Sequence, residues 1–71
     1  MDGTKIIKRL LVEKGINTVE LAKRLKCGTA NIYNKYRRNN FSVNEMEEIA
    51  DALGADLKIS FIDRETGELI I

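Results

Sequence analysis

The segment "TANIYNKYRR", residues 29–38, combines amide, hydroxyl and guanidinium groups at helical spacing. Residues at i, i+3, i+4 and i+7 share one face of an α-helix, so the polar groups fall opposite Ile32 and Tyr36. Asparagine can bond adenine, arginine can bond guanine or a phosphate, and a small methyl group can touch a thymine methyl. The side chains predicted as contacts to DNA bases are Thr29, Ala30, Tyr33, Asn34 and Arg37.

Residues around this segment are suited to a phosphate backbone. A helix beginning at Asn17 would offer free backbone N–H groups and its positive dipole end to a phosphate. Basic and amide side chains lie on that helix and beyond residue 34, where they add positive charge or hydrogen-bond donors. The predicted phosphate contacts are Asn17, Thr18, Lys23, Lys26, Lys35, Arg38, Asn39 and Asn40.

Each of these side chains also has a structural interpretation. Tyr33 could be a half-buried surface tyrosine, and Asn34 a solvated helix residue. Arg37 and Arg38 could serve only to complement the negative end of a helix dipole. Tyr36 shares a face with Ile32 and is therefore predicted to lie in the core.

The charge of the chain is divided along its length. Residues 1–40 contain ten Lys or Arg and three acidic residues, a net charge of +7, whereas residues 41–71 contain two and eight, a net charge of −6. This division predicts that the first half binds a polyanion. The alternative is a small protein with two solvated faces of opposite charge.

Four helices and a hairpin are predicted to position these groups. Apolar residues at a spacing of three and four predict helices, Asn17 and Ser42 have capping-box spacing to a glutamate, and "DLKISFID" alternates in the manner of a strand. The predicted helices are 4–14, 17–26, 29–37 and 43–53, and the predicted β-hairpin is 56–71.

The second and third helices have the arrangement of a helix-turn-helix. The small side chain of Ala22 would let one helix cross the other closely. Apolar side chains, including the single cysteine as a small plug, would fill the space between the helices, since neither helix is long enough to be stable alone. These inner residues are Leu21, Leu25, Cys27 and Ile32.

Residues 16–54, "INTVELAKRLKCGTANIYNKYRRNNFSVNEMEEIADALG", resemble the Cro/C1 repressor-type (Xre-like) helix-turn-helix family. The resemblance implies a DNA-binding regulator of transcription, often a dimer on a palindromic operator. Three positions depart from the family pattern. Lys26 stands where the family usually has glycine, Gly28 where the recognition helix usually has a Ser or Thr cap, and Thr18 where it usually has glutamine.

The expected fold is therefore mainly α: a single domain over 1–71, a four-to-five-helix Cro/C1-type unit with a C-terminal β-hairpin. The tail holds more apolar surface than four short helices need, so it is expected to form a homodimer. The alternative is a hairpin packed on its own helices. The residues predicted to form the dimer are Ile59, Phe61, Ile62, Leu69, Ile70 and Ile71.

Composition argues against other classes. With no histidine and one cysteine, a zinc site, another metal site or a cofactor is not expected, and no spacing suits an enzyme. No apolar run is long enough to span a membrane, and a cytoplasmic protein is expected. The open alternative is an antitoxin, or another protein-interaction module, that binds a protein partner through the hairpin.

Overall fold

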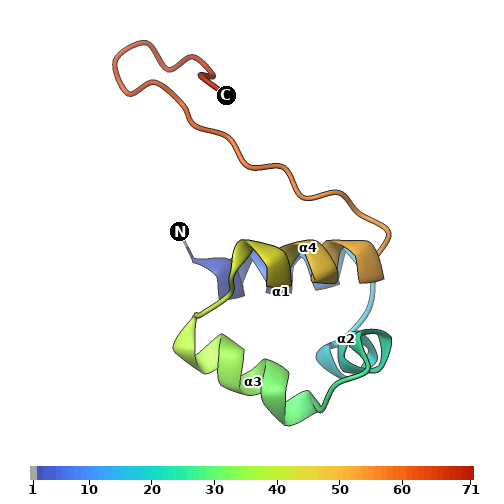
Figure 1. The fold of residues 1–71 in the computed structure, drawn as a ribbon. Helices are drawn as coiled ribbons and strands as arrows, with labels where there is room; N and C mark the ends of the chain where they lie inside the picture. The colour runs from blue at the N-terminus through green and yellow to red at the C-terminus, as the bar shows by residue number, and fades with distance from the viewer. Residues whose placement is uncertain (1) are drawn as a thin grey trace.

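The computed structural model describes residues 2–71 and contains four helices within them (Figure 1). Each begins and ends within one residue of its predicted bounds. The described residues form no strand longer than a single bridge. The helices are α1 (Gly3–Lys14), α2 (Thr18–Leu25), α3 (Thr29–Arg38) and α4 (Val43–Ala52).

Local hydrogen bonds explain why α2 and α4 begin where they do. Asn17 Oδ1 accepts from the backbone N–H of Glu20 at 2.9 Å and starts α2. Ser42 Oγ accepts from the N–H of Glu45 at 3.1 Å, and the Glu45 carboxylate accepts from the N–H of Ser42 at 3.0 Å. The capping box predicted for α4 is therefore complete, whereas α2 has the Asn17 half only.

The core lies where the inner faces of all four helices meet. Leu21 is fully buried, and Ala22 is 2% exposed, as expected for the small residue at a helix crossing. Tyr36 is 8% exposed, which confirms its predicted core position. The buried cluster consists of Ile7, Leu11, Leu21, Ala22, Ile32, Tyr36, Ile49 and Leu53.

Cys27 is exposed, so the prediction that it plugs the core is wrong. The reason lies in the preceding residue. Lys26 adopts the left-handed conformation, with φ of 56°, and ends α2. Cys27 then follows the last turn, with its N–H donating to the carbonyl of Ala22 at 3.0 Å, and its thiol lies outside the packed face.

The predicted hairpin over 56–71 is not confirmed. The tail extends away from the helices (Figure 1) and contains one antiparallel bridge, between Ile62 and Leu69. Asp63 N–H donates to the carbonyl of Glu68 at 2.7 Å, and Gly67 takes the left-handed conformation that the turn requires. An isolated pair of strands is only marginally stable. The two segments that pair around the turn have no packed face, because the large apolar side chains from Ile59 onward are exposed.

Candidate DNA-binding surface

The outer face of α3 carries the predicted base contacts. Ile32 and Tyr36 anchor its inner face and are buried. On the other side Ala30, Asn34 and Arg37 are exposed, and Tyr33 is half exposed. Thr29, at the first turn of the helix, is partly buried. The structure therefore gathers all five residues on one helix, with the largest polar groups toward solvent.

Asn34 and Arg37 are hydrogen-bonded to each other. Arg37 Nη2 donates to Asn34 Oδ1 at 2.7 Å. The spacing of i and i+3 brings the two side chains together on the helix surface. Both residues are exposed, so the pair is available to a partner.

Tyr36 fixes α3 to the helices behind it. Its hydroxyl lies 3.1 Å from Thr18 Oγ1 in α2, and its backbone carbonyl accepts from Thr4 Oγ1 in α1 at 3.0 Å. Lys8 Nζ lies 5.1 Å from the centre of its ring, a cation–π contact. The hydroxyl of Thr18, predicted to face a phosphate, thus has a partner within the protein.

Asn39 has a structural role that the sequence reasoning missed. It ends α3 in the left-handed conformation, with φ of 50°. Its Oδ1 accepts from the N–H of Thr4 at 3.0 Å and from Thr4 Oγ1 at 3.1 Å, which ties the end of α3 to the start of α1. The available signal was the residue type, since asparagine tolerates positive φ better than most residues.

Lys35 is directed toward α4 and forms an ion pair with Glu45. The side chains are 41% and 31% exposed, so the pair is partly screened by solvent. The hydrogen bond from Lys35 and then the backbone N–H of Ser42 lower the pKa of Glu45 below its usual value. The pair occupies the ammonium of Lys35, which was predicted to hold a phosphate.

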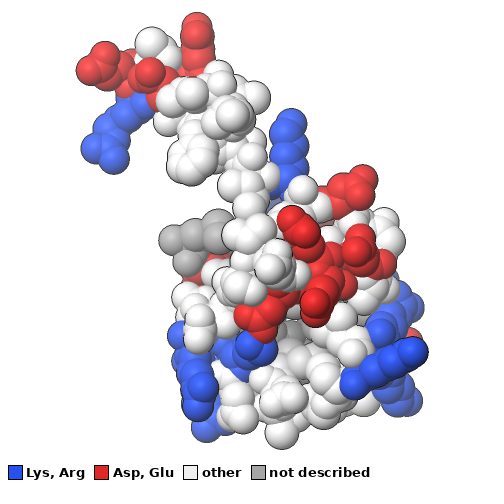
Figure 2. All heavy atoms as spheres, in the orientation of Figure 1, with Lys and Arg blue, Asp and Glu red and all other residues white. Residues whose placement is uncertain are grey.

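The remaining predicted phosphate contacts lie on α2, at its two ends and at the C-terminal end of α3. Lys23 is exposed on α2 and Lys26 directly after it, and Arg38 and Asn40 are exposed at the end of α3. Asn17 is exposed, but its side chain is used by the α2 cap. Figure 2 shows basic residues on both sides of the half of the molecule that holds α2 and α3.

Acidic residues gather elsewhere. Glu47, Glu48 and Asp51 are exposed on α4, and Figure 2 shows acidic groups over that helix and at the far end of the tail. Because these groups would repel a phosphate backbone, the charge distribution favours the α2–α3 side for a polyanion.

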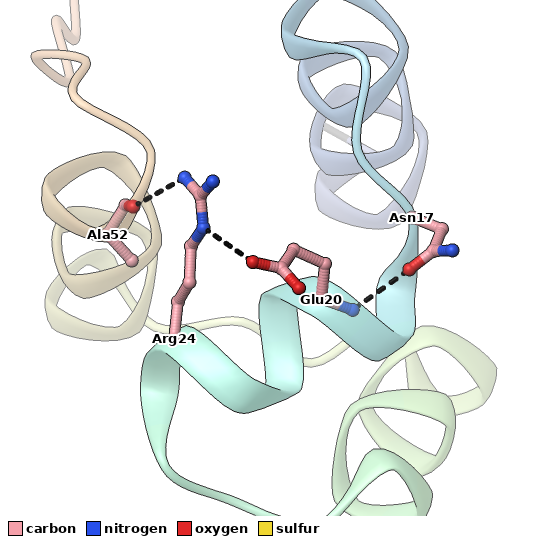
Figure 3. A network of polar contacts seen from close by, with 4 residues as sticks. All are labelled: Asn17, Glu20, Arg24 and Ala52. Carbon is pink, nitrogen blue, oxygen red and sulfur yellow. Dashed lines mark hydrogen bonds and ion pairs between the residues drawn. The ribbon is translucent and has the colours of Figure 1, made fainter.

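Arg24 connects α2 to α4 (Figure 3). Its Nε lies 3.3 Å from the Glu20 carboxylate, and its Nη1 donates to the carbonyl of Ala52 at 3.2 Å. The guanidinium thereby satisfies a carbonyl in the last turn of α4. The spacing of Glu20 and Arg24 was visible in the sequence, but the contact with Ala52, 28 residues away, was not.

A family model described as the bacteriophage CI repressor helix-turn-helix domain matches residues 5–59. The chain belongs to this family. The match confirms the resemblance to Cro/C1-type repressors, and the CI repressor family comprises DNA-binding regulators of transcription rather than enzymes. It spans α2, α3 and α4, nearly all of α1, and the first part of the tail.

Comparisons with curated proteins and with solved structures found no match. Over residues 2–71, no cluster of His, Cys, Asp and Glu could hold a metal ion. No helix in that range has the length and apolar character to cross a membrane.

Proposed function

We propose that this CI repressor-type domain is a sequence-specific repressor that places α3 in the major groove of double-stranded DNA. One observation carries the proposal: α3 buries Ile32 and Tyr36 and leaves Tyr33, Asn34 and Arg37 toward solvent. A helix with its side chains fits the major groove, which is about 12 Å wide. Binding would repress transcription because the protein would occupy the site that polymerase needs. We place this function in the cytoplasm.

Phosphate contacts would supply much of the affinity and base contacts the specificity. The exposed basic groups would contact the backbone beside the groove: Lys23 on α2, Lys26 directly after α2, and Arg38 at the end of α3. Asn40 adds a neutral donor. The backbone N–H groups at the start of α2 are placed to meet a phosphate, although the Asn17 side chain serves the cap.

The test is selection of a binding site from random duplex DNA, followed by fluorescence anisotropy of three variants. Asn34→Ala and Thr29→Ala are expected to reduce the preference for the selected site over scrambled DNA. Arg38→Ala is expected to lower the affinity for the selected and the scrambled duplex about equally, because a phosphate contact carries no base information. Unchanged binding by all three variants would contradict the groove assignment.

We also propose that the tail makes the protein a homodimer. Six large apolar side chains of the tail are at least half exposed, which is costly for an isolated chain. They are Ile59, Phe61, Ile62, Leu69, Ile70 and Ile71. A two-fold dimer would place two recognition helices about 34 Å apart, one turn of DNA, and so would match a palindromic operator. A monomer in analytical ultracentrifugation at tens of micromolar would contradict this proposal.

The same exposed tail favours one alternative, an antitoxin or other protein-interaction module that binds a protein partner. An antitoxin can also bind its own promoter, so this function is compatible with an α3 that reads DNA. A short reading frame for a toxin beside the gene, and a complex of the two proteins that the Phe61→Lys variant does not form, would support it.

A further inference from the structure

The hydrogen bond between Asn34 and Arg37 limits what the two side chains can offer to DNA. Asn34 Oδ1 is the acceptor, at 2.7 Å from Arg37 Nη2. The asparagine amide has one oxygen that accepts and one nitrogen that donates, whereas guanidinium has donors only. With one lone pair of Oδ1 held against a cation, the groups that stay fully free for a partner are the NH₂ of Asn34 and the other N–H groups of Arg37.

This set of groups fits one base edge better than the others. Adenine presents an acceptor, N7, and a donor, the N6 amino group, so it needs both the oxygen and the nitrogen of an asparagine. Guanine presents two acceptors, N7 and O6. An adenine amino group at Asn34 Oδ1 would share the oxygen with the guanidinium and lie close to its positive charge.

We propose that Asn34 and Arg37 act as one unit that reads guanine, so that the operator carries a G·C pair opposite the C-terminal half of α3. This inference rests on the proposed function and replaces the separate pairing of Asn34 with adenine. Arg37 then determines specificity in two ways. It contacts the base itself, and its hydrogen bond to Asn34 Oδ1 leaves the NH₂ group of Asn34 to face the base.

The position of the pair on the fold supports this role. It lies on the turn of α3 whose inner side is Tyr36, which contacts α1 and α2, and it is followed by Asn39, which bonds to Thr4. The helix that carries the pair is therefore held in place before DNA arrives. Such preorganisation reduces the entropy lost on binding.

The experiment uses the full chain and the duplex selected from random DNA. Each base pair of one half-site is replaced in turn by the other three, and affinity is measured by anisotropy for the wild type, Arg37→Ala, Asn34→Ala and Arg38→Ala. Asn34 and Arg37 are exposed, so their variants should fold, and circular dichroism checks this.

We expect one position at which the wild type prefers guanine over adenine by on the order of tenfold. At that position Arg37→Ala should prefer adenine, because it frees Asn34 Oδ1. Asn34→Ala should still prefer guanine with lower affinity, and Arg38→Ala should keep the wild-type preference. The proposed pairing of Asn34 and Arg37 is wrong, although α3 still reads DNA, if Arg37→Ala leaves every base preference unchanged. It is also wrong if the position whose preference Arg37→Ala changes is one at which the wild type prefers adenine. If the selection yields no preferred sequence, the proposed function fails and this inference fails with it.

Discussion

At the scale of single residues, the turn between α2 and α3 holds Lys26 and Gly28, two of the three positions at which the chain differs from the pattern of the family it resembles. Lys26 has φ of 56°, a conformation that costs a residue with a Cβ about 1 kcal/mol or more. Its N–H nevertheless donates to the carbonyl of Lys23 at 3.1 Å and so helps to end α2. The structure places this lysine in the left-handed conformation that favours glycine, which is the residue expected at this position from the family resemblance.

Lys26→Gly is expected to stabilise the protein. It removes the Cβ strain but adds freedom to the unfolded chain, so a net gain of about 0.5 kcal/mol is expected. Urea denaturation measures the gain, provided that the dependence of the unfolding free energy on urea concentration is the same in both proteins. Lys23→Gly is the matched control and should lose about 1 kcal/mol, because it lies within the helix. A loss of stability in Lys26→Gly would contradict the account of this turn.

The hydroxyl of Tyr36 supplies a second test. Tyr36→Phe removes the hydrogen bond to Thr18 and is expected to cost about 1 kcal/mol of unfolding free energy, since the Thr18 hydroxyl is partly buried. Tyr33→Phe, on the half-exposed tyrosine of the same helix, should change stability little. Equal effects of the two variants in thermal or urea unfolding would argue that the Tyr36–Thr18 bond does not hold α3.

Side-chain roles were predictable only where they depend on near neighbours. Helical periodicity alone placed Tyr36 in the core and Tyr33 outside. Asn39 and Arg24 contact residues 35 and 28 positions away, so their roles depend on how the helices pack. The same is true of Lys35, whose partner Glu45 lies on another helix.

At the scale of elements, three of the four helices, α1, α2 and α4, have starts that a capping side chain encodes locally, whereas α3 has no such cap. Asn17 and Ser42 each bond a backbone N–H three residues later, and neither bond needs the rest of the fold. The tail has no such local determinant beyond its turn. The alternation of apolar and polar residues in the tail predicts strands. Strands are stable only with a pairing partner and a packed face, and the tail forms a single bridge.

The α4 start predicts a dependence of stability on pH. Hydrogen bonds from Lys35 and Ser42 lower the pKa of Glu45 in the folded state. Its contribution is therefore complete above the ordinary glutamate pKa and is lost as the pH falls through the lowered value. Glu45→Gln should destabilise the protein at neutral pH, and the difference from wild type should narrow on acidification.

Urea denaturation of both proteins across the acid range measures this difference. Glu47→Gln serves as the control for the loss of one negative charge on α4. A difference between wild type and Glu45→Gln that stays constant, or that widens, as the pH falls would contradict the assigned role of Glu45.

At the scale of the whole molecule, charge and apolar surface are divided. Figure 2 shows basic side chains on both sides of the half that holds α2 and α3 and acidic side chains over α4 and at the far end of the tail. Six of the exposed large apolar side chains lie on the tail. The sequence predicted this division from the net charges of its two halves. The position of the tail relative to the helices was not predictable, because its residues do not specify a surface on which it packs.

If the tail forms the dimer, breaking the dimer should affect the operator and its half-site differently. Phe61→Lys is expected to give a monomer that loses about tenfold or more in affinity for the full palindrome, because the two half-sites are no longer linked. Its affinity for a single half-site should be unchanged. Val12→Lys, which replaces an exposed apolar residue on α1, is the control and should behave as wild type. Equal affinity of Phe61→Lys and wild type for the palindrome would contradict the role of the tail.

Amide chemical-shift mapping of the protein with its selected duplex would show whether α3 enters the groove. We predict that the largest changes fall on residues 29–38 and on the first turn of α2, with small changes on the outer face of α4. The largest changes on α4, with α3 unaffected, would show that the DNA lies on another face and would contradict the account.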